Sequence, residues 1–357
     1  MKRTFAYIGC RTTRERNAQG TGISVFEVHS NGIWTHIQTL APLVNPSFLA
    51  IHPDRKTLYT VHGDNESASA FRIDPSTGQI SFLNSQSGVG RNPVHLSFSR
   101  DGEALIIAGY ATGDATRIPI SPDGSLKNPA TPSITFDGAP GPHRVEQKAS
   151  HPHHIPRYVT SVCDSTWHIV PDKGLDTVSA VRWLDDGTSV VHSRHAREGA
   201  GPRHVAFHPS LPLLYVVNEL HSTLTTWSFD PASGALEPLH TSSVIPPNYH
   251  DLTRAAAIAI ATDGRSLYVT NRGHDSISTI TLDEKSGYPI FVEWTPSQGK
   301  FPRFLCLGPD EKTLYVANEN SHLIVQFEIG ESRVPKPTGR TVSTGSPVCI
   351  VFNTVDV

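Results

Sequence analysis

One glutamate and three arginines stand at the ends of short apolar segments whose alternating β-branched and aromatic residues are typical of β-strands. Glu219 and Arg272 each directly follow such a segment, and Arg203 and Arg303 each follow the proline that begins one. A carboxylate can move a proton, and a guanidinium group binds phosphate or carboxylate through a planar fork of donors. Such clusters are typical of active sites, although Glu219 beside Arg203 or Arg272 could also be an ion pair that only ties neighbouring elements together.

Three histidines, His151, His153 and His154, lie in one polar segment. Imidazole is both a proton acceptor near neutral pH and the commonest metal ligand in proteins. The spacing matches no established metal site, and the only carboxylate near them in the sequence is Glu146, so we predict no bound metal. The sequence has no Gly-x-Ser-x-Gly elbow, Walker loop or dinucleotide fingerprint, which disfavours a serine hydrolase or a nucleotide enzyme and predicts no cofactor.

Further polar residues at comparable positions are candidates for binding a substrate. They are His153, His204, Asn218, Asn271, His274, Arg303 and Tyr110. Asparagine at a strand end more often caps local backbone groups than contacts a ligand, so Asn218 and Asn271 have a structural alternative. His274 lies in an Asn-Arg-Gly-His-Asp-Ser turn, where a turn-stabilising role and a catalytic role both fit the sequence.

A repeated pattern predicts how these residues are positioned. Proline followed by an alternating apolar segment occurs at 46–51, 93–98, 202–207, 302–307 and 347–352, with weaker copies near Arg157 and Ala256. The copies are spaced by roughly 51 residues, which is typical of propeller blades rather than of helical solenoids. The sequence therefore contains seven copies of one structural unit.

Each complete copy continues with three more predicted strands, and four antiparallel strands make one blade. We therefore predict an all-β, seven-bladed β-propeller that forms a single domain over residues 1–357. The last copy, beginning at Pro347, ends after its first strand, whereas residues 4–9 resemble the second strand of the other copies. Because an unpaired blade edge would be unfavourable, we predict that the N-terminal segment closes the last blade.

The blade geometry also predicts where the charged residues meet. In an antiparallel blade the first strand begins at the end of the ring where the second strand finishes. Residues after each proline and after each second strand should therefore converge on one mouth of the central channel. We expect Arg203, Glu219 and Arg272 to lie together there, near the histidine segment.

The composition excludes several classes of partner. A formal net charge of −3 gives no broad attraction to nucleic acid or to an anionic membrane. No apolar run approaches the ~20 residues of a membrane-spanning helix, and the apolar start is too short for a signal peptide, so we expect a cytoplasmic protein. The four cysteines lie far apart without a Cys-x-x-Cys pair, which predicts free and mostly buried thiols.

The chain resembles the lactonase family of seven-bladed propellers, which includes propeller-type 6-phosphogluconolactonases and 3-carboxy-cis,cis-muconate cyclases. The resemblance covers nearly the whole chain and is carried by four motifs. These are Val-Pro-Asp-Lys-Gly-Leu-Asp at 170–176, Gly-Pro-Arg-His-Val-Ala-Phe-His-Pro at 201–209, Tyr-Val-Val-Asn-Glu-Leu at 215–220 and Tyr-Val-Thr-Asn-Arg-Gly-His-Asp-Ser-Ile at 268–277.

The resemblance implies a site built from one histidine together with Arg203, Glu219 and Arg272. His153, His154 and Arg157 each compete for the position of the family histidine, and Ala257 replaces a glutamate of the family pattern. For hydrolysis of a lactone, Glu219 or His154 would act as the general base on a water molecule. The arginines would hold the anionic group of the substrate and stabilise the oxyanion.

Two other functions fit the same residues. In a cyclase of the carboxymuconate type, the arginines would hold the carboxylates of a polycarboxylate substrate and His154 or Glu219 would move a proton. A propeller that binds a ligand without catalysis is the third possibility, which the replacement at Ala257 favours. Retention of Arg203, Glu219 and Arg272 favours an enzyme, and we expect a hydrolase that opens a small anionic lactone of the sugar-acid type. The sequence does not indicate the oligomeric state.

Overall fold

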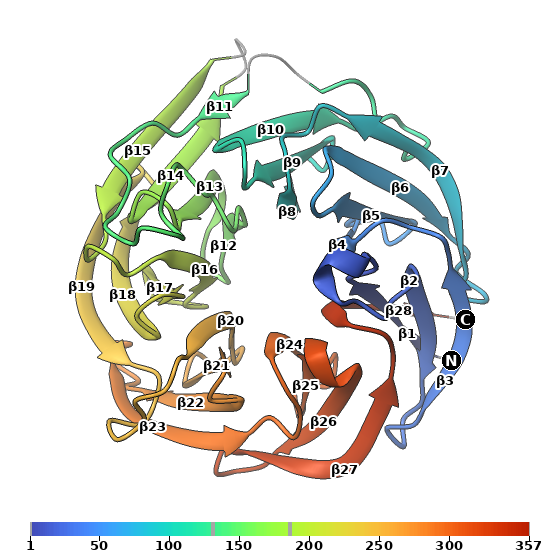
Figure 1. Cartoon of the computed structure of the whole chain (residues 1–357). Coiled ribbons are helices and arrows are strands. Elements are labelled where there is room, and N and C mark those ends of the chain that lie inside the picture. The colour runs from blue at the N-terminus through green and yellow to red at the C-terminus, as the bar shows by residue number, and fades with distance from the viewer. Residues whose placement is uncertain (1, 130–132, 185–187, 357) are drawn as a thin grey trace.

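A computed structural model of the chain describes residues 2–129, 133–184 and 188–356. Within these ranges, seven four-stranded antiparallel sheets surround a central channel (Figure 1). The architecture is the predicted seven-bladed β-propeller with four strands per blade. No helix in the described part of the chain is long and apolar enough to cross a membrane.

The strands of each blade follow one another from the channel outward (Figure 1). Blade 1 contains β4 (Pro46–Ile51), β5 (Thr57–His62), β6 (Ser67–Ile73) and β7 (Ile80–Ser87), and blade 2 contains β8 (Pro93–Phe98), β9 (Ala104–Gly109), β10 (Asp114–Pro119) and β11 (Ile134–Thr135). Blade 3 contains β12 (Arg157–Val159), β13 (Asp164–Asp172), β14 (Thr177–Trp183) and β15 (Ser189–His195), and blade 4 contains β16 (Pro202–Phe207), β17 (Leu213–Asn218), β18 (Thr223–Asp230) and β19 (Ala235–Ser243). Blade 5 contains β20 (Arg254–Ile260), β21 (Ser266–Arg272), β22 (Ser276–Leu282) and β23 (Pro289–Pro296), and blade 6 contains β24 (Pro302–Leu307), β25 (Thr313–Asn318), β26 (Leu323–Ile329) and β27 (Pro335–Ser343). Blade 7 contains β28 (Pro347–Asp356), β1 (Lys2–Cys10), β2 (Ile23–Val28) and β3 (Trp34–Leu40), and two short 3-10 helices, η1 (Arg14–Arg16) and η2 (Glu319–Ser321), lie in turns.

The two ends of the chain close the ring in blade 7, as predicted. β1 pairs with β28 from Lys2 opposite Asp356 to Cys10 opposite Pro347, and its other edge pairs with β2. The N-terminal segment therefore supplies three of the four strands of this blade. Because β1 is the second strand of blade 7, the residue that follows it, Arg11, is carried to the same mouth of the channel as Glu219 and Arg272.

The inner strands begin where the repeat predicted, with one small difference. Five of them begin at the repeated proline, and β12 begins at Arg157. The inner strand of blade 5 begins at Arg254, two residues before the predicted start at Ala256. This inner strand lacks the starting proline that marks five of the others, and a β-bulge between Ala255 and Ile258 interrupts its pairing with β21, as bulges also do near the start of other inner strands.

The apolar core lies between neighbouring blades, and a recurring tyrosine joins four of the blades to the next one. The hydroxyl groups of Tyr7, Tyr59, Tyr215 and Tyr268 donate hydrogen bonds of 2.7–3.0 Å to backbone carbonyls in the turn before the outer strand of the following blade. These tyrosines are buried, and burial raises the pKa of Tyr268 to about 12. The repeated Leu-Tyr-Val segment therefore serves both the core and the contact between blades.

All four cysteines are free thiols. Cys10 and Cys349 are buried, whereas Cys163 and Cys306 are half-buried. Burial raises the pKa of Cys10 to about 11 and that of Cys349 to about 12. Because a thiol with a raised pKa carries little thiolate, these two cysteines are poorly suited to nucleophilic catalysis.

Candidate functional site

A cavity of about 770 Å³ opens at the mouth of the channel where the predicted residues converge. Its lining includes six basic side chains, from Arg11, Arg16, Lys173, Arg254, Arg272 and Arg303, and four acidic ones, from Glu15, Glu146, Glu219 and Glu319. The basic groups exceed the acidic groups by two, so the cavity favours an anionic ligand although the whole chain is slightly negative. Its volume lies in the range of about 300–1,000 Å³ that is usual for small-molecule sites.

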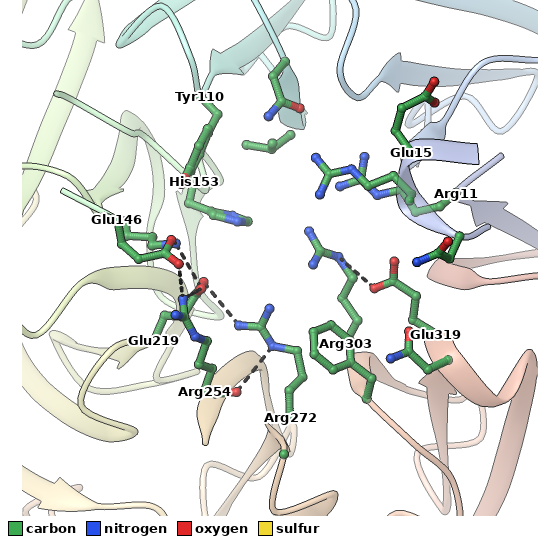
Figure 2. Close-up of a pocket in the computed structure, with 18 of the residues that line it drawn as sticks. Arg11, Glu15, Tyr110, Glu146, His153, Glu219, Arg254, Arg272, Arg303 and Glu319 are labelled. Atoms are coloured by element: carbon green, nitrogen blue, oxygen red, sulfur yellow. Dashed lines mark hydrogen bonds and ion pairs between the residues drawn. The ribbon is translucent and has the colours of Figure 1, made fainter. Parts of the chain in front are cut away.

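Glu219 is the centre of an ion-pair cluster on one wall of the cavity (Figure 2). Its carboxylate lies 2.9 Å from Nε of Arg203, 3.0 Å from Nζ of Lys173 and 3.3 Å from Nη2 of Arg272. Burial raises the pKa of Glu219, but the positive charges of Arg272, Lys173 and Arg203 outweigh burial and hold the pKa well below its ordinary value. Glu219 is therefore a buried anion that holds several cations in place and has little tendency to accept a proton.

Arg203 lies behind this cluster rather than in the cavity lining. Only 2% of its surface is exposed, and its guanidinium donates a hydrogen bond to the carbonyl of Ala256 in the next blade. Arg272, in contrast, lines the cavity. Its Nη2 donates to the carbonyl of Ala255 at 3.1 Å, and its guanidinium packs over the ring of Phe301 with 5.3 Å to the ring centre. Of these two arginines, Arg272 is the one placed to contact a ligand.

A second carboxylate, Glu146, joins the same cluster from the loop before blade 3. It accepts hydrogen bonds from Lys173 at 2.7 Å and from Arg254 at 2.6 Å. Burial raises the pKa of Glu146, but its hydrogen bond to Lys173 and the nearby positive charges lower the pKa overall. Lys173 thus bridges two carboxylates, Glu146 and Glu219, and all of these groups remain charged near neutral pH.

Two histidines, His153 and His322, line the cavity, and the ring of His153 points toward the cavity centre (Figure 2). This ring lies between Tyr110 and His204, with 5.4 Å between ring centres on each side. Its Nδ1 is buried without a hydrogen-bond partner. Burial lowers the pKa of His153 well below its ordinary value, and the charge of Arg203 lowers it further. His153 is therefore a neutral imidazole at neutral pH with an unprotonated ring nitrogen, and its lowered pKa makes it a weaker base than an ordinary histidine.

His154 and His204, both predicted as site residues, do not line the cavity. The two rings stack at 4.3 Å, and Nδ1 of His154 accepts a hydrogen bond from the backbone N–H of Val205 at 3.2 Å. Burial lowers the pKa of His154 to about 3. Neighbouring residues of an extended segment point to opposite sides, which explains why His153 reaches the cavity and His154 does not.

Arg157, the third competitor for the histidine position, and Ala257 lie outside the cavity as well. Arg157 forms an ion pair with Asp164 at the start of the next strand. Ala257, which stands where the family pattern has a glutamate, is 1% exposed and packs in the apolar core between blades 5 and 6. The cavity lining therefore contains no atom of Arg157 or of Ala257.

Asn218 and Asn271, which were predicted to bind the substrate, instead form hydrogen bonds within their own blades. The amide group of Asn218 donates to Oγ1 of Thr225 at 2.9 Å, and that of Asn271 donates to Oγ of Ser278 at 2.8 Å. His274 shares a 2.7 Å hydrogen bond with the hydroxyl of Ser276 inside its own turn. None of these three predicted site residues lines the cavity, whereas Tyr110 and Arg303 do.

Two buried aspartates hold the loops that carry the site. Asp172 is fully buried and accepts hydrogen bonds from the backbone N–H of His151 at 2.7 Å, from that of Gly174 at 2.8 Å and from the hydroxyl of Ser150. Burial raises the pKa of Asp172, and these hydrogen bonds oppose the rise. This clasp fixes the segment that presents His153.

Asp176 performs the same task for the following loop. Its two carboxylate oxygens accept hydrogen bonds from the backbone N–H groups of Gly199 at 2.6 Å and Gly201 at 2.8 Å, in the loop that leads into β16 and Arg203. Asp176 itself adopts a left-handed backbone conformation with φ of 52°, which aspartate tolerates better than most residues. The two aspartates of the segment 170–176 therefore have structural roles that support the site.

Several residues that line the cavity were not predicted as site residues from the sequence. Lys173 and Glu319 directly follow second strands, so their position alone could have indicated them. Arg254 lies before the predicted start of its strand, and Arg11 belongs to the N-terminal segment, whose place in the ring had to be known first. Within residues 2–129, 133–184 and 188–356, no group of three or more His, Cys, Asp and Glu side chains is arranged to hold a metal ion.

Comparison with known proteins gives a consistent match along the whole chain. The family described as "Lactonase, 7-bladed beta-propeller" matches residues 5–352. A 6-phosphogluconolactonase of Bacillus subtilis is 31% identical over 99% of both chains, and a 6-phosphogluconolactonase of Formosa agariphila is 27% identical over 93% of this chain and 96% of that one. The solved structure of the periplasmic gluconolactonase of Pseudomonas aeruginosa superimposes with a TM-score of 0.88 at 25% identity and covers 99% of both chains.

Proposed function

The chain belongs to the lactonase family of seven-bladed β-propellers, and on this premise we propose that its charged cavity hydrolyses a small anionic lactone of the 6-phosphogluconolactone type. One observation carries the proposal. A neutral imidazole, His153, points into a positively charged cavity that Arg272 also lines (Figure 2). A neutral base beside fixed cationic donors is the arrangement that addition of water to a carbonyl group requires.

The reaction needs one proton acceptor and one site for negative charge. A water molecule adds to the lactone carbonyl carbon while His153 accepts its proton, and the carbonyl oxygen becomes an oxyanion that Arg272 stabilises by hydrogen bonding and charge. The tetrahedral intermediate then breaks its bond to the ring oxygen. The proton held by His153 passes to that oxygen, which becomes a hydroxyl group, and the new carboxylic acid ionises to release one proton to the solution.

Glu219 has a positioning role in this mechanism. Its lowered pKa makes it a weak proton acceptor, because its carboxylate already interacts with Arg272, Lys173 and Arg203 at 3.3 Å or less. By holding Arg272 at the cavity wall, Glu219 keeps the oxyanion donor in place before the substrate arrives. Preorganised donors of this kind need no rearrangement during the reaction.

Replacement of the proposed base tests the function directly. We expect His153→Gln to lower kcat for 6-phosphogluconolactone by about 10²- to 10⁴-fold, because a general base contributes a factor of that size. The matched control is His240→Gln, which removes an exposed histidine from the outer strand β19. Equal activity in both variants and in the original protein would contradict the proposed role of His153.

A further inference from the structure

The cavity has a second basic wall opposite the Glu219 cluster (Figure 2). Arg11, which follows β1, and Arg303, which lies in β24, extend toward the cavity centre from blades 7 and 6 (Figure 2). Arg16 of η1 also lines this side. The ring closure brings these arginines together, since their positions in the chain are almost 300 residues apart.

Arg11 is a buried guanidinium whose donors are not filled. It is 3% exposed, and its Nη1 has no hydrogen-bond partner. Asp64 is 3.7 Å from that nitrogen, which is too far for a hydrogen bond, and its carboxylate accepts two hydrogen bonds from Arg16 instead. Buried polar groups in proteins are normally satisfied, so an unpaired nitrogen on a guanidinium group that lines the cavity indicates a place for an anion beside Arg11.

Arg303 also lacks a carboxylate within hydrogen-bonding distance. Its Nε lies 3.8 Å from Oε2 of Glu319, and that oxygen is itself buried without a hydrogen-bond partner. Glu15 also lines this side of the cavity, but it forms no ion pair with an arginine in the described part of the chain. The carboxylates on this wall therefore leave the donors of Arg11 and Arg303 free for another anion.

We propose that Arg11 and Arg303 form an anion subsite that binds the phosphate group of the substrate while the lactone carbonyl lies between His153 and Arg272. Two guanidinium groups suit a phosphate dianion because each presents a planar set of donors to its oxygens. This inference rests on the proposed function and extends it, since the subsite makes the enzyme prefer phosphorylated lactones to neutral ones. A carboxylate shares part of this chemistry, so the test compares the two anions.

The kinetic test uses three substrates. These are 6-phosphogluconolactone, glucono-lactone without phosphate, and an aldaric acid monolactone that carries a carboxylate instead. We expect Arg11→Gln and Arg303→Gln to lower the ratio of kcat/KM for the phosphorylated lactone to that for the neutral lactone by about 10- to 100-fold, as expected for loss of hydrogen bonds to a charged group. If the variants instead lower the preference for the carboxylate lactone alone, the phosphate assignment is wrong.

A matched control separates the subsite from a general loss of positive charge. Arg194→Gln removes an arginine that is paired with Glu237 on the exposed outer strand of blade 3. We expect this control to keep the substrate preference of the original protein. An equal fall in preference in the control and in Arg303→Gln would overturn the subsite. Arg303 is partly exposed, with 18% of its side-chain surface accessible, so its replacement tests the idea even if Arg11→Gln fails to fold.

Binding of inorganic phosphate separates this inference from the proposed function. By calorimetry, we expect the original protein to bind phosphate and the Arg303→Gln variant to bind it at least 10-fold more weakly. If the protein hydrolyses no lactone but binds phosphate in this Arg303-dependent way, the proposed function fails and the subsite stands. If it hydrolyses lactones with a substrate preference that both variants retain, the function stands and the subsite is refuted.

Discussion

Replacing Glu219 by glutamine tests whether the cation cluster depends on this single buried carboxylate. The side chain of Glu219 is 5% exposed, and those of Arg203 and Arg272 are 2% and 6% exposed. Glu219→Gln keeps the size of the side chain but removes its charge. The two buried arginines and Lys173 would then face one another, and Glu146 would be the remaining carboxylate that contacts Lys173.

The size of the effect follows from this burial. Removing one partner of a buried ion pair typically costs about 3–5 kcal/mol, because the other charge is left uncompensated away from water. At an unfolding entropy of roughly 2.1 cal/mol/K per residue, a protein of 357 residues loses about 1 °C of Tm for each 0.75 kcal/mol. We therefore expect Glu219→Gln to lower Tm by about 4–7 °C.

Differential scanning calorimetry measures this shift, with Glu237→Gln as the matched control. Glu237 forms an ion pair with Arg194 at 2.6 Å, but more than half of each side chain is exposed, so its loss should change stability by less than about 1 kcal/mol. We also expect Glu219→Gln to reduce turnover, since Arg272 loses the group that holds it. A change in Tm no larger than that of the control would refute the reasoning.

Three further predictions follow from the fold and the site. Deleting residues 1–10 removes β1, which pairs with both β28 and β2. The variant should therefore show no cooperative thermal transition by circular dichroism. An unchanged transition would rule out closure of the ring by this strand. Burial lowers the pKa of His154 to about 3 and that of His168 to about 4. The unfolded chain protonates these histidines below about pH 6.5, whereas the folded protein keeps them neutral, so the free energy of unfolding falls as the pH drops below about 6.5. At pH 5 the loss is about 2 kcal/mol per histidine. A Tm that is equal at pH 7 and pH 5 would contradict this. Asp172→Asn weakens the clasp on the histidine segment and should lower kcat about 10-fold or more by displacing His153, with Asp230→Asn in an exposed turn as the control; equal kcat in the two variants would show that the clasp does not position His153.

The ring could be predicted from the sequence because its signals are local and repeated. A proline at the start of an inner strand and a tyrosine in the second strand recur in most blades, and each has a physical role that the structure retains. The closure by residues 4–9 was predictable because the last copy lacks three strands. The start of β20 was misplaced because this inner strand lacks the proline that marks the start of five others.

The site could be predicted only in part. Glu219, Arg272, Arg303, Tyr110 and His153 were identified and do line the cavity, because the end of each second strand and the start of each first strand meet at one mouth. The choice between His153 and His154 depends on which side of an extended loop faces the channel, and no local pattern fixes that. Arg203 appeared to be a ligand-binding residue, but its burial behind Glu219 is visible only in three dimensions.

The arrangement of the second basic wall could not be predicted from the local sequence either. Arg11 and Arg303 meet through closure of the ring, and neither belongs to a motif that specifies its partner. Whether their guanidinium groups have partners depends on the packing around them. Asp64 accepts its hydrogen bonds from Arg16, and Glu319 lies 3.8 Å from Arg303.

The most direct test of the account is proton release by the purified protein with 6-phosphogluconolactone in the presence of a chelator, beside a parallel measurement of diene absorbance with 3-carboxymuconate. The account predicts release of one proton per lactone, faster than spontaneous hydrolysis and slowed about 10²- to 10⁴-fold by His153→Gln. Loss of diene absorbance without acid release from the lactone would instead indicate a cyclase. No reaction with any lactone would contradict the central claim that this cavity is a hydrolytic site.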